Sequence, residues 1–113
     1  MHPGEPERRS AERFAVNLPV AVRATDGSFE PETALTRDLS AKGIFFFMSA
    51  SPKEGARIEF TVTLPPEVTL TDPMRVNARG RVVRVLAGQS GRQVGVAATI
   101  DGYNSFIRLS RSL

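Results

Sequence analysis

The sequence predicts an all-β domain, a small six-stranded antiparallel barrel followed by a short C-terminal α-helix. Apolar residues alternate with polar ones in several short runs, as in strands that bury one face. Turn-forming residues separate these runs, and 113 residues suffice for one hydrophobic core. Six short strands in a domain of this size favour closure into a barrel.

Three strands are predicted in the first half of the chain. The first runs from Phe14 to Arg23, where every second residue is apolar: Phe14, Val16, Leu18, Val20 and Val22. Thr25-Asp26-Gly27-Ser28 is a strong hairpin signal. The second strand is expected from about Glu32 to Ser40 and the third from Gly43 to Met48. Because residues 44–48 are all apolar, one face should meet the barrel interior and the other a helix or a partner.

Three further strands are predicted in the second half. Arg57 to Leu64 alternates without interruption, and residues 65–73, with three prolines, should form a connection. The fifth strand starts at Met74 and changes parity near Gly80, which predicts a β-bulge there with Val83 and Val85 pointing inward. Val94, Val96, Ala98 and Ile100 form the sixth strand.

The C-terminal segment has a different periodicity. Asp101 is a suitable N-cap, and apolar residues follow it at helical spacing, among them Tyr103, Phe106 and Ile107. We therefore expect an amphipathic helix over residues 101–113 that covers part of the barrel, including the outer face of residues 44–48.

Composition argues against an enzyme or a metal protein. The chain has no cysteine, and its single histidine, His2, lies in the leader. The acids are scattered, and no glycine-rich phosphate loop opens a helix. We therefore expect no catalytic residue, no bound metal and no cofactor.

The termini and the hydropathy suggest where the protein resides. Residues 1–7 contain two prolines, a glycine and no periodic apolar positions, so we expect a disordered leader. Residues 8–113 should form a single domain. No apolar run approaches the roughly 20 residues needed to span a bilayer, and the leader lacks the apolar region of a secretory signal. A cytoplasmic protein without membrane insertion is expected.

One polar motif follows the second strand. Asp38, Ser40 and Gly43 form the pattern D-x-S-x-x-G, and period-two geometry places Asp38 and Ser40 on one face, opposite Leu39. A carboxylate beside a hydroxyl can receive the donor-rich edge of a flat polar ligand, and Gly43 permits close approach or a positive φ. The alternative is a β-turn in which Asp38 and Ser40 bond to their own backbone.

A second motif precedes the first strand. Arg9 and Arg13 stand four positions apart, with Arg8 just before them. Guanidinium groups match phosphates and stack on flat rings. The alternative is a solvated charge cluster, partly neutralised by Glu12.

In this order and separation, R-x-x-x-R and D-x-S-x-x-G resemble the PilZ domain, a bacterial β-barrel family best known as a receptor for cyclic di-GMP. The resemblance extends from Arg8 to the C-terminal segment. It implies that Arg9 and Arg13 contact the phosphates and guanines, and that Asp38 and Ser40 hydrogen-bond the ligand while Gly43 shapes the turn. Arg8 resembles the additional arginine of members that hold a stacked ligand dimer.

The resemblance implies a receptor or adaptor. The ligand would order residues 8–13, a flexible arm, over the barrel and so change the surface offered to a downstream protein partner. One alternative is a PilZ-like interaction module that does not bind the nucleotide. Another is a single-stranded nucleic-acid binder using Arg75, Arg79, Arg81, Arg84 and Arg92. The shortage of exposed aromatic residues disfavours nucleic acid.

Overall fold

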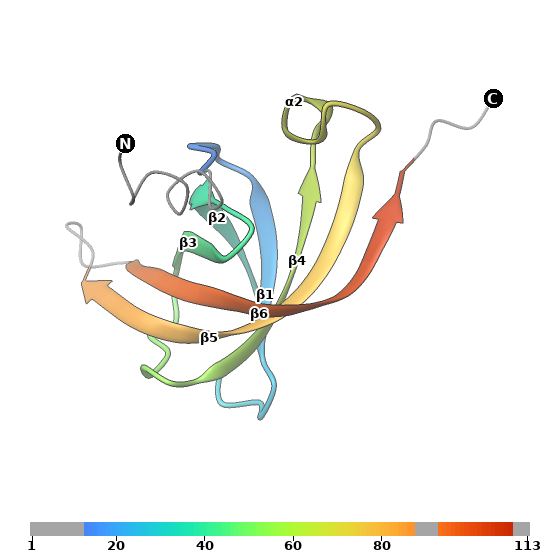
Figure 1. Cartoon of the computed structure of the whole chain (residues 1–113). Coiled ribbons are helices and arrows are strands. Elements are labelled where there is room, and N and C mark those ends of the chain that lie inside the picture. Colours follow the sequence, from blue (N-terminus) through green and yellow to red (C-terminus); the bar gives the residue numbers. More distant parts are fainter. Residues whose placement is uncertain (1–12, 88–92, 110–113) are drawn as a thin grey trace, which may run out of the picture.

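The computed structural model describes residues 13–87 and 93–109. Within these residues the chain forms six strands and one single-turn helix: β1 (Pro19–Ala24), β2 (Glu32–Leu39), β3 (Gly43–Met48), β4 (Arg57–Leu64), α2 (Pro66–Thr69), β5 (Met74–Ala87) and β6 (Val94–Arg108). The strands close into a barrel in the order β1-β2-β3-β6-β5-β4, and all neighbours are antiparallel (Figure 1). The predicted six-stranded barrel is confirmed.

Alternating side chains fill the barrel interior. Ile58, Phe60 and Val62 of β4 are 1%, 2% and 3% exposed, and Phe46 and Met48 of β3 are fully buried. Each such side chain contributes about 1.5–3 kcal/mol by leaving water. The centre of the barrel is therefore a packed core, and binding sites must be sought at its rim and on its surface.

The predicted turn between β1 and β2 is present. The N–H of Ser28 donates to Oδ1 of Asp26 at 2.9 Å, and Gly27 adopts φ +74°. The same hydrogen bond lowers the pKa of the Asp26 carboxyl below its ordinary value. A short polar side chain and a glycine together reverse the chain here.

The β5–β6 ladder contains three register shifts. Their extra residues are Val83 on β5 and Asp101 and Asn104 on β6. The ladder does shift beside Gly80, but the extra residue at that point, Asp101, belongs to the partner strand. A Cβ on Gly80 would lie 1.7 Å from the carbonyl oxygen of Thr99, so the two backbones approach more closely than any side chain would allow.

The predicted inward position of Val83 is wrong. Val82 is 1% exposed and Val83 is 50% exposed, because β5 keeps its parity through Gly80 and changes it only at Val83. The bulge thus lies three residues later than the sequence suggested.

The predicted C-terminal helix is also wrong where the structure describes this segment. Residues from Asp101 to Arg108 continue β6 and pair with β5. The bulges at Asp101 and Asn104 turn Ile100, Tyr103 and Phe106 toward the same side of the strand, opposite Gly80, Ala78 and Val76. Three apolar residues at three-residue spacing resemble the apolar stripe of a helix, which explains the wrong prediction. Residues 110–113 of the predicted helix lie outside the described part of the chain.

Candidate functional site

Asp38, at the end of β2, lies between two arginines. Nη1 of Arg13 donates to Oδ1 of Asp38 at 2.5 Å, and Nε of Arg37 donates to Oδ2 at 2.9 Å. The Asp38 side chain is 12% exposed, whereas those of Arg13 and Arg37 are 64% and 56% exposed. We call these three residues the Asp38 corner. Both of its cations keep much of their surface toward solvent, and a carboxylate with about four acceptor positions can receive further donors.

A β-bulge in β2 creates this arrangement. Thr36 pairs with Phe46 but Asp38 pairs with Phe45, so Arg37 is the extra residue. Thr36 and Leu39 are both buried, while Asp38 lies on the other side of the strand from Leu39, as predicted. The bulge itself was not predicted, because no glycine or proline marks it.

The segment that carries Arg13 is anchored to β2. Phe14 and Leu39 exchange two backbone hydrogen bonds, with N···O distances of 2.7 and 3.0 Å. The N–H of Leu18 also donates to the buried hydroxyl of Thr36 at 2.8 Å. These contacts place Arg13 beside Asp38, which stands 25 positions away in the sequence.

Ser40 and Gly43 form the loop after β2. Oγ of Ser40 accepts the N–H groups of Lys42 and Gly43 at 3.3 and 3.1 Å, and the N–H of Ser40 donates to the carbonyl of Gly43 at 2.9 Å. For Ser40 this is the turn-forming alternative considered from the sequence. Gly43 allows the backbone of β3 to lie close to that of β6, because a Cβ there would lie 3.3 Å from the carbonyl oxygen of Ala98.

Arg37 also covers the ring of Phe45, which lies on the side of β3 that faces away from the barrel interior. Its Cζ lies 3.9 Å from the centroid of the Phe45 ring, a cation–π geometry. Phe45 is 8% exposed, and its ring meets that of Phe47 edge to face with 5.5 Å between the centroids. The ring also packs against Gly95, where a Cβ would come within 2.7 Å of it. The expectation that a C-terminal helix covers this face is therefore wrong. Sequence reasoning missed Arg37, although its position directly before Asp38 was the available signal.

The structure brings together only part of the predicted set. Arg13 and Asp38 are in contact, and Ser40 and Gly43 form the adjoining loop. Arg8 and Arg9 lie outside the described residues. Among the described residues there is no cluster of three or more His, Cys, Asp or Glu side chains able to hold a metal ion. A search of the same residues finds no helix with the length and hydropathy of a membrane span.

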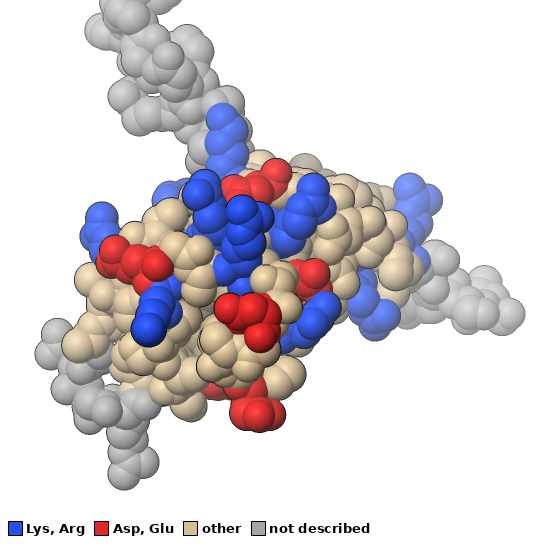
Figure 2. All heavy atoms as spheres, turned by 90° about the horizontal axis from the view of Figure 1, so that it is seen from below, with Lys and Arg blue, Asp and Glu red and all other residues tan. Residues whose placement is uncertain are grey.

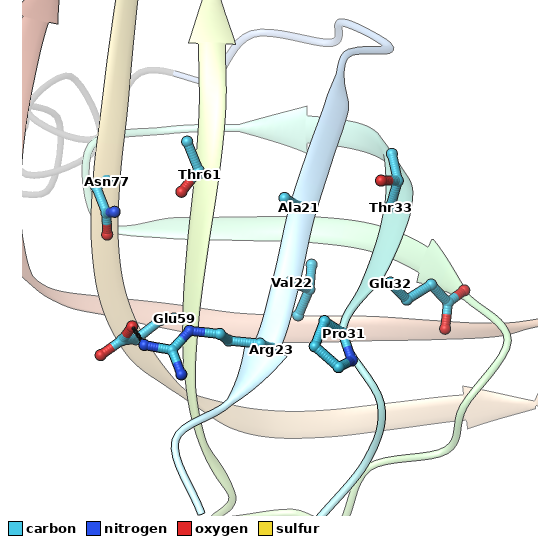
Figure 3. Close-up of a pocket in the computed structure, with 9 residues that line it drawn as sticks. All are labelled: Ala21, Val22, Arg23, Pro31, Glu32, Thr33, Glu59, Thr61 and Asn77. Atoms are coloured by element: carbon cyan, nitrogen blue, oxygen red, sulfur yellow. Dashed lines mark hydrogen bonds and ion pairs between the residues drawn. The ribbon is translucent and has the colours of Figure 1, made fainter. Parts of the chain in front are cut away.

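Among the cavities that described residues line elsewhere on the barrel, two are larger than 200 Å³. A polar hollow of about 290 Å³ lies on the outer face of β1. Its lining residues, among them Ala21 and the ion-paired Arg23 and Glu59, are drawn in Figure 3. It shares no residue with the Asp38 corner. The second is an apolar cavity of about 220 Å³, which includes Leu39, Ser40 and Ala41 in its wall.

Comparison with known proteins agrees with this architecture. The chain matches the PilZ domain family over residues 7–110 and belongs to that family. PilZ domains are regulatory binding domains, and binding of cyclic di-GMP is the known role of the family.

Two solved structures share the fold. The Bacillus subtilis inhibitor of motility (MotI/DgrA) has a TM-score of 0.70 and 18% identity over 87% of this chain and 44% of its own. The chain thus spans less than half of that protein. The PilZ domain of CeSA from a cellulose-synthesizing bacterium has a TM-score of 0.58 and 24% identity, covering 82% of this chain and 83% of its own. No curated protein matches the chain.

Proposed function

We propose that this chain is a receptor for cyclic di-GMP and that the ligand binds at the Asp38 corner. The observation that carries the proposal is the contact between Arg13 and Asp38, which come from the two separate motifs of the family pattern. A buried carboxylate flanked by two exposed guanidinium groups suits a ligand that is both anionic and rich in flat donor edges.

Each member of the corner has a distinct role in the proposal. Asp38 accepts hydrogen bonds from the Watson–Crick edge of a guanine, using acceptor positions that the arginines leave open. Arg13 binds a phosphate or stacks on a guanine. Arg37 retains its bond to Oδ2 and keeps the carboxylate oriented. Ser40 and Gly43 hold the loop in shape through the bonds that they already make.

Arg8 and Arg9 supply further phosphate contacts in this proposal, and their engagement provides the signal. Closure of residues 8–13 over the ligand changes the surface that a downstream protein meets. Hydrogen exchange of these amides, measured with and without saturating cyclic di-GMP, tests the step. We expect slower exchange with ligand, and unchanged exchange would exclude this mode of signalling.

The energies are sufficient for a micromolar receptor. A hydrogen bond to a charged group contributes roughly 1.5–3 kcal/mol. Several of them, with stacking, can reach the approximately −8 kcal/mol of a micromolar complex after the cost of ordering is subtracted.

Calorimetric titration with cyclic di-GMP tests the proposal directly. We expect the parent protein to bind, and Arg13→Ala and Asp38→Ala each to weaken binding by about a hundredfold, the effect of removing one partner of a desolvated charged contact. Arg23→Ala is the matched control, because Arg23 is also half-exposed and paired with a carboxylate but borders the hollow in Figure 3. Binding that survives both changes at the corner would refute the assignment.

The nucleic-acid alternative makes a different prediction. On the face seen in Figure 2, Lys and Arg side chains are interspersed with Asp and Glu and form no continuous positive surface among the described residues. A polynucleotide would release many counterions and show a steep salt dependence, whereas a dinucleotide should show a shallow one. A non-binding interaction module would show no heat with either ligand.

A further inference from the structure

The two halves of β6 have different neighbours. Residues Val94 to Thr99 pair with β3 on one side and β5 on the other. The last backbone hydrogen bond on the β3 side is the N–H of Ile100 donating to the carbonyl of Lys42 at 2.9 Å. From Asp101 to Arg108 the strand pairs, among the described residues, with β5 alone, and Figure 1 shows its red end running beside β5 with no strand on its other side. This half of β6 is an open edge with backbone groups available for pairing.

An apolar cavity of about 220 Å³ lies beside this open edge. Tyr103 and Phe106 of β6 line it on one side, and Phe14 and residues 39–41 line it on the other. The remaining wall comes from Ile100 of β6, the middle and end of β4, the start of β5 and α2; the β4, α2 and β5 residues are Phe60, Val62, Leu64, Val68 and Val76. A strand laid along the open edge would therefore direct every second side chain toward this cavity.

The cavity offers no free polar group to a ligand. The hydroxyl of Tyr103 donates to the carbonyl of Ala41 at 2.6 Å, and that of Ser40 is bonded within its loop. Every other lining side chain is apolar. An occupant must accordingly be apolar, and the volume suits one or two side chains rather than a large cofactor.

The bulges at Asp101 and Asn104 decide against a second copy as the occupant. Bulges twist an edge and hinder pairing between two identical strands. They leave Ser105 to Arg108 as the regular stretch, in which Phe106 is 57% exposed at the rim of the cavity. A short extended peptide of another protein can use such a stretch.

We propose that an extended segment of a partner protein adds to β6 as an extra strand along Ser105 to Arg108 and places an apolar side chain in the cavity. The segment has apolar residues at alternate positions and no proline at the paired ones. Its binding site is separate from the Asp38 corner and requires no nucleotide.

Selection from a display library of random short peptides tests the proposal on the whole chain. We expect the enriched peptides to share alternate apolar residues and Phe106→Asp to weaken the best of them by about tenfold or more, as for a central interface residue. Leu35→Asp is the matched control, since Leu35 is also a 48% exposed apolar residue but lies on β2, away from the proposed pairing stretch, and does not line the cavity. It should bind the peptide as the parent does, and Phe106→Ser provides a second cavity variant should the aspartate disturb folding.

Backbone pairing is tested on the unaltered protein with N-methylated versions of the selected peptide. Only every second N–H group of the peptide can face β6, because successive N–H groups of a strand point to opposite sides. Methylation of those N–H groups should abolish binding, and methylation of the intervening ones should leave it intact. Peptides without an alternating pattern, equal effects of the Phe106 and Leu35 changes, or insensitivity to N-methylation would each overturn the proposal. So would ultracentrifugation showing a dimer that Phe106→Asp dissociates, which would assign the edge to a second copy.

Discussion

The Asp38 corner and the apolar cavity use consecutive residues at the end of β2, but ion pairs stabilise the first and apolar packing stabilises the second. At the corner, two guanidinium groups bind the two oxygens of Asp38. One residue later, Leu39 belongs to the cavity wall, where packing against β4, β5 and β6 replaces charge. One hydrogen bond, from the hydroxyl of Tyr103 to the carbonyl of Ala41, joins β6 to the loop between β2 and β3.

Because ion pairs and apolar packing contribute differently to folding, we expect different parts of the barrel to determine its stability and its ligand binding. Arg13 and Arg37 are more than half exposed, and ion pairs made by exposed side chains contribute about 0–1 kcal/mol to folding, so either arginine can be replaced at little structural cost. Apolar packing and close backbone approach contribute several kcal/mol where they are tight. The corner should therefore control ligand binding with little effect on folding, and the β5–β6 ladder should do the reverse.

The largest effect is expected from Gly80→Ala, which acts on the ladder alone. The new Cβ would lie 1.7 Å from the carbonyl oxygen of Thr99, so the two strands must separate. We expect a loss of about 3 kcal/mol or more in the free energy of unfolding, measured by urea denaturation. Gly27→Ala, which meets no atom within 4 Å and is strained only by its φ of +74°, should cost about 1 kcal/mol. Equal losses for the two variants would show that the close approach is absent.

An intermediate effect is expected from Arg37→Ala, which acts on the corner alone. The change removes the bond to Oδ2 of Asp38 and the cover over Phe45. Affinity for cyclic di-GMP should fall about tenfold, the value of one hydrogen bond to a charged group, while stability falls by about 1 kcal/mol or less. Calorimetry and urea denaturation of the same sample separate the two quantities. A large loss of stability with unchanged affinity would reverse the proposed division of roles.

The smallest effect is expected at Tyr103, which connects the two regions. Partial burial raises the pKa of Tyr103 above its ordinary value of 10.0, because the phenolate is less well solvated in the folded protein than in the unfolded chain. The unfolded chain therefore loses this proton first, and stability should decline as the pH rises from about 10 through the folded-state pKa. Tyr103→Phe should cost about 1 kcal/mol at neutral pH and remove this part of the decline.

Absorbance of the phenolate gives the midpoint of the Tyr103 titration without ambiguity, because Tyr103 is the one tyrosine in the chain. A midpoint at or below 10 in the folded protein would show that folding does not desolvate the Tyr103 side chain.

The regular parts of this fold could be predicted from the sequence. Alternation in Arg57 to Leu64 gave that strand with its observed bounds, since a half-buried strand leaves a period of two. The resemblance of the two motifs to the PilZ domain implied that Arg13 and Asp38 share a site, and the two residues are in contact. Local patterns carry this information because each depends on one face or one motif.

The bulges could not be predicted in the same way. Arg37, Asp101 and Asn104 are extra residues in their ladders only because of the register of the neighbouring strand. The two shifts in β6 placed Tyr103 and Phe106 on one side at three-residue spacing, which a helix would also produce. Arg37 was missed for a related reason, since its contact with Phe45 depends on the bulge in β2.

The most direct measurement of the central claim follows the arginine Nε–Hε signals by NMR during titration with cyclic di-GMP. The signals of Arg13 and Arg37 should shift together and saturate with the calorimetric affinity, because both groups flank the bound carboxylate. The signal of Arg23, paired with Glu59 beside the polar hollow, should stay in place. Binding of the nucleotide with no change at Arg13 and Arg37 would show that the ligand lies elsewhere on the barrel.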